Sequence, residues 1–190
     1  MSVKSENKQV FQDYIQSKLP LIETSLDGLV SEPAGKLYQS LFKAARYSLL
    51  APGKRLRPIL TLATVETLGG NQEAAIFPAC TLEMVHTYSL IHDDLPSMDD
   101  DDLRRGRPTL HKIFPEGHSI LTGNFLLTYA FEILSQQKRL SPELRLKLIE
   151  TLSFHSGAGG LLGGQVIDLE SEDKNISQKT LEEINCKRIH

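Results

Sequence analysis

The sequence is poor in cysteine, in long apolar runs and in net charge, and each shortage excludes a class of protein. Cys80 and Cys186 are the only cysteines, and they form neither a disulfide framework nor a metal-ligand spacing. Residues 1–16 lack the apolar core of a signal peptide, and no apolar run is long enough to span a membrane. The net charge of -3 provides no broad field for nucleic acid or for an anionic membrane. We therefore expect a cytoplasmic protein without nucleic-acid binding or stable membrane insertion.

Strand alternation is also missing, and helical periodicity dominates instead. The 190 residues, of which 40% are hydrophobic, are enough for one domain with a substantial core. We predict a single all-α domain over residues 1–190, with a charged loop at 97–116. The expected helices cover residues 10–19 (ending at Pro20), 37–49, 58–68, 72–95, 120–134 and 142–154, the last capped by Ser141. Five glycines between 157 and 164 indicate close helix packing or the approach of a ligand.

An acidic run follows the most apolar of these helices. Six aspartates lie between Asp93 and Asp102. Like charges ~4 Å apart repel by about 1 kcal/mol in water, and the C-terminal end of a helix dipole disfavours anions further. Mg²⁺ is a suitable counter-ion, because it binds hard oxygens and is commonly shared between one or two carboxylates and a substrate phosphate. Asp93 and Asp99 are the candidate ligands. A solvated acidic loop neutralised by neighbouring arginines is the alternative, and the EF-hand spacing with its central Gly, which would favour calcium, is missing.

Basic residues supply a second candidate site. Lys54 and Arg57 stand just before a predicted helix N-terminus, which attracts phosphate oxygens that arginine grips bidentately. His86 lies two helical turns before Asp93, roughly 10 Å away along the same face. A solvated basic turn and an ordinary core histidine are the alternatives for these residues taken singly. Their combination with the acidic run favours a diphosphate site.

Together these segments resemble the trans-isoprenyl diphosphate synthases, especially the bacterial farnesyl diphosphate synthases. The resemblance is carried by Gly53–Pro58, by the DDxxxxD run followed by LRRGRPT within residues 86–111, and by GGQVID at 163–168. It implies an all-α isoprenoid-synthase bundle around a central cavity, of which this chain is the N-terminal part. It also implies a homodimer that uses Mg²⁺ to condense isopentenyl diphosphate with an allylic diphosphate, dimethylallyl or geranyl, to geranyl or farnesyl diphosphate.

The roles of individual residues follow from the same resemblance. Asp93 and Asp99 are implied to hold magnesium, with Asp94 assisting and Arg104 gripping the allylic diphosphate. The isopentenyl diphosphate site is implied to comprise Lys54, Arg57, His86 and Arg105. Gln165 and Asp168 are implied to line the cavity from a later helix. Tyr88 and Ser89, about one turn before Asp93, are implied to close the cavity floor and set product length.

The chain ends before the second aspartate-rich motif of that family would appear, so we expect a truncated synthase with little activity alone. Three other interpretations remain. In these interpretations the chain is a non-catalytic fragment or partner subunit, a terpene cyclase, or a longer-chain polyprenyl synthase. A cyclase holds no second diphosphate, so the basic residues Lys54, Arg57 and His86 argue against it.

Overall fold

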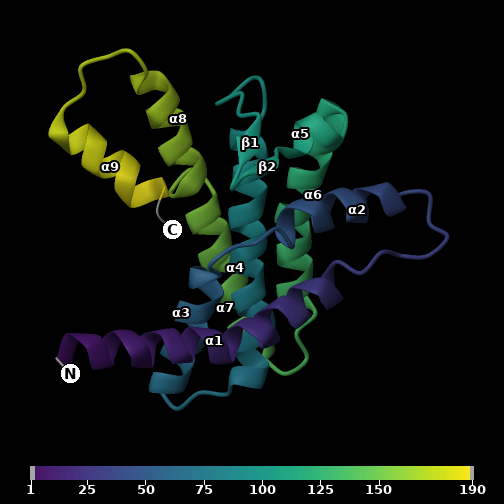
Figure 1. Cartoon of the computed structure of the whole chain (residues 1–190), viewed down its shortest axis with the longest axis vertical. Helices are drawn as coiled ribbons and strands as arrows, with labels where there is room; N and C mark the ends of the chain where they lie inside the picture. Colours follow the sequence, from purple (N-terminus) through teal and green to yellow (C-terminus); the bar gives the residue numbers. More distant parts are fainter. Residues whose placement is uncertain (1–2, 189–190) are drawn as a thin grey trace. The chain divides into compact units, whose positions relative to one another are not determined.

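The computed structural model describes residues 3–188, with side chains from 8 to 187, and within that range it confirms the all-α prediction (Figure 1). A β-hairpin with two residues in each strand accompanies the helices. The backbone forms two compact units that divide between Gln137 and Lys138. The first contains α1 (Val3–Leu29), α2 (Gln39–Leu49), α3 (Leu56–Thr67), α4 (Gln72–Asp93), β1 (Leu103–Arg104), β2 (Arg107–Pro108), α5 (Leu110–Ile113) and α6 (Glu116–Ser135); the second contains α7 (Pro142–Ser156), α8 (Leu161–Ser171) and α9 (Gln178–Arg188). The single helical domain over 1–190 stays a prediction.

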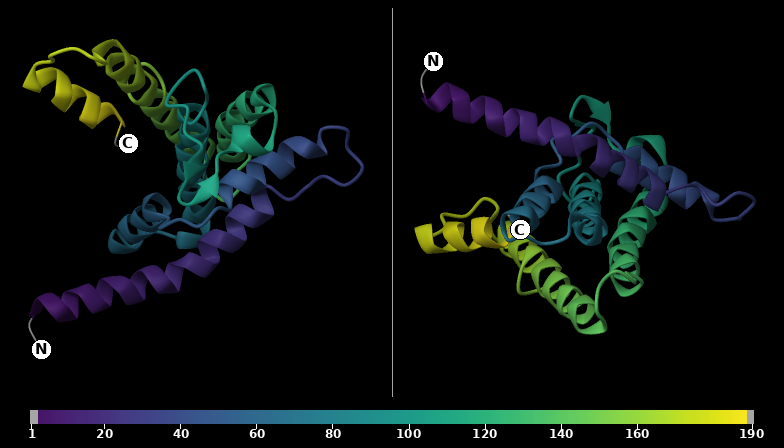
Figure 2. Two further views of the ribbon diagram at one scale, coloured as in Figure 1. Left: turned by 45° about the horizontal axis from the view of Figure 1, so that its top comes forward. Right: turned by 90° about the horizontal axis from the view of Figure 1, so that it is seen from below.

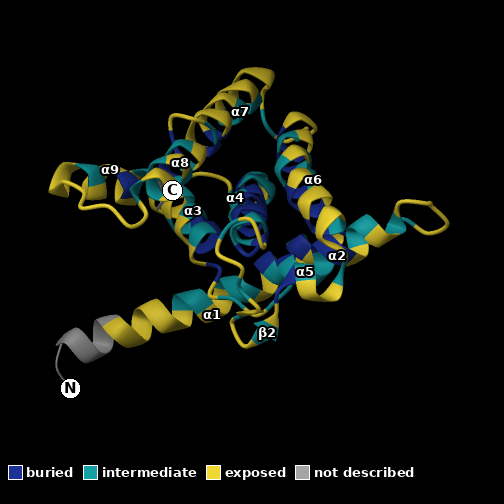
Figure 3. Cartoon of the chain, turned by 90° about the horizontal axis from the view of Figure 1, so that it is seen from above, coloured by how far each residue is buried: buried dark blue, intermediate teal, exposed yellow. Residues whose placement is uncertain are grey.

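Helix α4 is the centre of the first unit. It packs against α1, α2, α3 and α6, and α3 and α6 flank it in the right-hand view of Figure 2. Its start is capped by Asn71, whose side chain accepts the Glu73 N–H at 2.8 Å. Buried residues occupy most sides of α4 (Figure 3), and Ala79, Cys80 and Met84 are fully buried. The helix is therefore a rigid support for whatever its C-terminal end carries.

Length and composition alone would also let α4 cross a membrane. Among the described residues it is the one helix that meets this criterion, and 61% of its most apolar window is buried inside the protein. A central core helix has this same composition, so the finding is weak evidence for a membrane span.

The prediction that the first helix ends at Pro20 is wrong. Helix α1 continues through Pro20 to Leu29. Proline removes one backbone hydrogen bond, but the residues beyond it form the buried stripe Ile22, Leu26 and Val30, all fully buried at i, i+4 and i+8. Val10, assigned to the apolar stripe before the proline, is instead 67% exposed. Tertiary packing beyond Pro20 outweighs the local cost of the proline.

The predicted charged loop at 97–116 contains regular structure. Strands β1 and β2 pair antiparallel, with Leu103 opposite Pro108 and Arg104 opposite Arg107. The connecting residues Arg105 and Gly106 have φ of 54° and 76°, and two-residue type I′ hairpin loops require positive φ at both positions. A strand of two residues is too short to show alternation in the sequence. This hairpin matters because it carries Arg104 and Arg105.

The second unit confirms the predicted cap of its first helix. The Ser141 hydroxyl accepts the Leu144 N–H at 3.2 Å, and Pro142 follows at the first helical position. A Cβ on Gly160 would lie 2.0 Å from the His155 carbonyl oxygen, and one on Gly163 would lie 2.1 Å from that of Ala158. The glycine-rich stretch therefore allows the backbone to fold closely back on itself between α7 and α8.

Candidate functional site

The acidic run folds back over the C-terminal end of α4. The Asp99 N–H donates to the Asp93 carbonyl at 2.9 Å, and the Asp100 N–H donates to that of Leu95 at 3.1 Å. These bonds satisfy carbonyl groups that a helix end leaves without partners. Asp100 adopts a left-handed φ of 50°, which aspartate tolerates better than most residues. The fold-back brings the backbones of Asp93 and Asp99 together, with Asp93 half-buried and Asp99 exposed.

Asp94 differs from the other aspartates because it is buried and paired with an arginine. Its side chain is 6% exposed and accepts from Arg104 Nε at 2.5 Å, while Arg104 Nη2 contacts Asp101 at 3.3 Å. Burial raises the pKa of Asp94, and the Arg104 guanidinium opposes this rise only in part. Asp94 therefore fixes the orientation of the Arg104 guanidinium.

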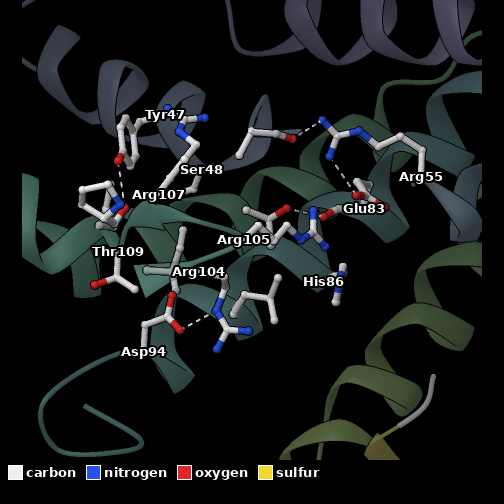
Figure 4. Close-up of a pocket in the computed structure, with 16 residues that line it drawn as sticks. Tyr47, Ser48, Arg55, Glu83, His86, Asp94, Arg104, Arg105, Arg107 and Thr109 are labelled. Carbon is white, nitrogen blue, oxygen red and sulfur yellow. Dashed lines mark hydrogen bonds and ion pairs between the residues drawn. The ribbon is translucent and has the colours of Figure 1, made fainter. Parts of the chain in front are cut away.

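A pocket begins above this pair (Figure 4). Arg104 and Asp94 lie at one end of it, and Arg55 and Glu83 lie at the other. Its volume is about 50 Å³, little more than a few water molecules occupy. Leu90, Ile91 and Leu110 contribute apolar surface.

A larger hollow adjoins the first pocket and collects the predicted basic residues. Its volume is about 520 Å³, within the range of small-molecule sites. Lys54, Arg57, His86 and Arg105 all line it, from the loop before α3, from α3, from α4 and from the hairpin. His86 and Arg105 also line the first pocket. The structure thus brings together four residues that the sequence placed up to about 50 positions apart, around a space large enough for a diphosphate.

Arg55 is a part of this site that the sequence analysis missed. Its side chain is 2% exposed, and it contacts Glu83 Oε1 at 3.0 Å and Glu23 Oε1 at 2.7 Å. Burial alone would lower its pKa, but hydrogen bonds to Glu23 and Glu83 outweigh burial and raise it. Arg55 also has a left-handed φ of 48°. The sequence shows the cation but gives no sign that it points into the core while its neighbour Lys54 is exposed.

His86 is held neutral by its surroundings. Burial, followed by repulsion from Arg57, Arg105, Arg104 and Arg55, lowers its pKa to about 4. In the unfolded chain this pKa is about 6.5. Between pH 6.5 and 4 the unfolded state therefore binds the proton that the folded state does not, and stability from this residue decreases as the pH falls through that interval.

Inorganic pyrophosphate is expected to raise the pKa of His86 from about 4 towards neutrality, because an anion beside the ring offsets the arginine charges. The measurement is an NMR pH titration of the His86 ring with and without saturating pyrophosphate. Pyrophosphate that binds but leaves this pKa unchanged would place the anion elsewhere.

Tyr88 and Ser89 are both buried on α4 but line neither pocket. The Tyr88 ring packs edge-on against His92, with centroids 5.1 Å apart, and Ser89 Oγ donates to the His86 carbonyl at 2.9 Å. Their implied control of product length remains a prediction.

Gln165 and Asp168 lie on α8 in the second unit, three positions apart and so on one side of the helix. Their implied place in the lining of the cavity remains a prediction.

No ready-made metal cluster exists in the described part of the chain: no three His, Cys, Asp or Glu side chains there could hold an ion. Mg²⁺ nevertheless fits the donors present, because it takes one or two carboxylates and completes its shell with water and phosphate oxygens. Asp93, which is half-buried, and Asp99, which is exposed, offer such hard oxygens on adjacent stretches of backbone.

The sequence is similar to several known proteins. Residues 38–188 match the family model described as polyprenyl synthetase. A farnesyl diphosphate synthase of Geobacillus stearothermophilus is 46% identical over 176 residues, which cover 92% of this chain and 59% of the relative. A geranylgeranyl diphosphate synthase of Cyanophora paradoxa is 47% identical over 181 residues, covering 93% of this chain and 58% of the relative.

A solved structure shares the fold as well. The apo crystal structure of an FPP/GFPP synthase from Zymomonas mobilis matches with a TM-score of 0.85 at 38% identity, covering 95% of this chain and 64% of that one. The chain thus spans about three-fifths of the length of these relatives.

Proposed function

We propose, since this chain belongs to the polyprenyl synthetase family, that the protein condenses isopentenyl diphosphate head to tail with an allylic diphosphate. The observation that carries the proposal is the pair of adjoining hollows that share His86 and Arg105. The larger hollow is lined mainly by cations, with Glu83 paired to Arg55 as its one carboxylate, and the smaller one ends at the Asp94–Arg104 pair. A basic hollow beside an acidic run that has its own arginine suits a reaction between two diphosphates, one held by cations and the other by a metal.

The allylic diphosphate belongs at the acidic run in this proposal. Mg²⁺ held by Asp93 and Asp99 would neutralise charge on the departing diphosphate. Arg104 adds donors from the hairpin, and its pairing with buried Asp94 keeps the guanidinium oriented before substrate arrives. Asp94 is therefore proposed to position Arg104 as well as to assist the metal.

Isopentenyl diphosphate belongs in the larger hollow. Lys54, Arg57 and Arg105 supply charge, and neutral His86 supplies a hydrogen-bonding ring nitrogen. With its diphosphate fixed there, the substrate presents its double bond to the allylic carbon.

The condensation itself needs no nucleophile from the protein. The allylic C–O bond breaks, its electron pair leaves with the diphosphate, and the double bond of isopentenyl diphosphate forms the new C–C bond. A proton is then lost to the released diphosphate. Apolar walls that exclude water are required, because water would capture the cation first. Gln165 and Asp168 are proposed to line the cavity beyond these walls, and the active protein is proposed to be a cytoplasmic homodimer.

The relatives include farnesyl and geranylgeranyl diphosphate synthases, and we infer a farnesyl-type product from Tyr88. Tyr88→Ala is expected to lengthen the product by at least one isoprene unit, because removing the ring opens space along α4. The measurement is chromatography of the dephosphorylated products. Tyr88→Phe keeps the ring and is the control, and its product should have the wild-type length. A product of unchanged length from Tyr88→Ala would show that Tyr88 does not control product length.

The test of the proposed function incubates the purified protein with dimethylallyl and isopentenyl diphosphates and Mg²⁺, and separately measures binding of inorganic pyrophosphate by calorimetry. Binding together with a prenyl product supports a synthase. Absence of binding contradicts the proposal outright.

A non-catalytic, diphosphate-binding partner subunit is the second candidate. Pyrophosphate binding without product, with turnover appearing only when a longer family member is added, is the result this candidate predicts.

A further inference from the structure

Gly53 stands where the basic loop meets the hairpin. A Cβ built on Gly53 would lie 2.4 Å from Arg105 Nη1 and 3.5 Å from Arg105 Cζ. The same Nη1 donates to the Pro52 carbonyl at 3.0 Å. The Arg105 guanidinium therefore lies against the loop in the space that a side chain at position 53 would occupy.

Backbone conformation does not require glycine at position 53. Its φ lies outside the left-handed range that disfavours other residues, unlike that of Gly69 at 71° or Gly106 at 76°. Other than Arg105, the nearest atom to the added Cβ is Arg55 Nη1 at 3.3 Å, which would have to move by a few tenths of an ångström, far less than Arg105. The close approach of Arg105 is what the absence of a side chain permits.

Arg105 is held in this position from its other side. It occupies the first loop position of the hairpin with φ of 54°, a strained conformation for arginine that costs roughly 1–2 kcal/mol. Strand β2 is in turn anchored to α2, because the Tyr47 hydroxyl donates to the Pro108 carbonyl at 2.8 Å and the Arg107 guanidinium lies 4.6 Å from the Tyr47 ring centroid. Strain of this kind clusters at binding sites.

We propose that Gly53 is a positioning residue that seats Arg105 across the basic loop, so that the hairpin and the loop bind one isopentenyl diphosphate as a single surface. The inference rests on the proposed function. A methyl group at position 53 displaces the Arg105 guanidinium, breaks its bond to Pro52 and separates it from Lys54 and Arg57. The loop itself keeps its fold, because the atoms displaced are the end of a flexible side chain.

The experiment is a double-mutant cycle on the whole chain, with inorganic pyrophosphate as the probe and calorimetry as the readout. Gly53→Ala is expected to weaken binding about tenfold, the value of one charge-assisted contact. In an Arg105→Met background the same change is expected to have no further effect. Arg105→Lys combined with Gly53→Ala is expected to recover part of the affinity, because lysine has no branched group to meet the methyl.

Gly117→Ala is the matched control, since Gly117 lies in α6 and a Cβ there meets nothing within 4 Å. Equal affinity in wild type and Gly53→Ala, or an equal loss in both backgrounds, overturns the inference alone. A wild-type protein that does not bind pyrophosphate contradicts the proposed function and the inference with it. Thermal unfolding of each variant separates loss of the fold from loss of positioning.

Discussion

Glu83→Ala is expected to lower the free energy of unfolding by about 3 kcal/mol, the low end of the range for breaking a buried ion pair, because it removes the only buried carboxylate that Arg55 contacts and leaves it the half-exposed Glu23. Both side chains are nearly inaccessible, at 4% for Glu83 and 2% for Arg55, and their contact is 3.0 Å long. The cost comes mainly from the Arg55 Nη1 group, which stays buried and loses its acceptor, while Nε and Nη2 keep Glu23. Urea denaturation followed by circular dichroism measures it.

Two variants separate this mechanism from a general effect of removing a glutamate. Glu23 contacts the same guanidinium but is 41% exposed, so Glu23→Ala is expected to cost only about 0–1 kcal/mol. Replacing Arg55 by Met and Glu83 by Leu together removes both charges, and we expect this pair to be far less destabilising than Glu83→Ala alone. Similar costs for Glu83→Ala and Glu23→Ala would show that the buried pair is not what secures this loop to α4.

The loss also reaches the binding site. Arg55 joins the basic loop to the α4 residue one turn before His86, so the pair fixes Lys54 and Arg57 relative to that ring. Under conditions where the variant remains folded, Glu83→Ala should weaken pyrophosphate binding, although the negative charge of Glu83 would repel pyrophosphate. Removing a negative group from an anion site ordinarily strengthens binding, so the direction of the effect is diagnostic.

Asp93→Asn is expected to lower turnover about 10²–10³-fold, the usual cost of losing one group that stabilises developing charge. It is also expected to abolish the strengthening of allylic diphosphate binding by Mg²⁺, because an amide oxygen is a weaker ligand than a carboxylate. The change keeps the backbone bond that folds the loop back, since the Asp99 N–H donates to the Asp93 main-chain carbonyl. Calorimetry with geranyl diphosphate, with and without Mg²⁺, measures the second effect independently of catalysis.

Asp102→Asn is the matched control within the same run. Asp102 is exposed and pairs with Lys112 at 2.6 Å, which lowers its pKa through the hydrogen bond and charge of that lysine. Its carboxylate is thus paired with a lysine at the surface. If Asp102→Asn and Asp93→Asn reduce Mg²⁺-dependent binding equally, the acidic run acts through bulk charge and the assignment of Asp93 as a ligand is wrong.

The residue types of the site were visible in the sequence because their chemistry is local. Six aspartates after an apolar helix, with cations on both sides, already require a counter-ion and suggest a phosphate, whatever the fold. Helix α4 was predictable for the same reason, since a segment with apolar residues on nearly all sides is typical of a buried helix. The end of α1 was not predictable, because the energy that carries it through Pro20 comes from Ile22, Leu26 and Val30 packing on the core.

The amino-acid sequence by itself determined the family, the all-α fold and the set of charged groups, since these depend on composition, spacing and periodicity. Only the tertiary structure decided which of these charged side chains are buried in ion pairs and which are exposed at the site. Adjacent Lys54 and Arg55 read alike in the sequence, yet a left-handed φ turns one towards the core and leaves the other exposed at the hollow. Asp93 and Asp94 read alike too, and one helical step buries the second against Arg104. Burial and pairing depend on which segments meet in space, and no local pattern records that.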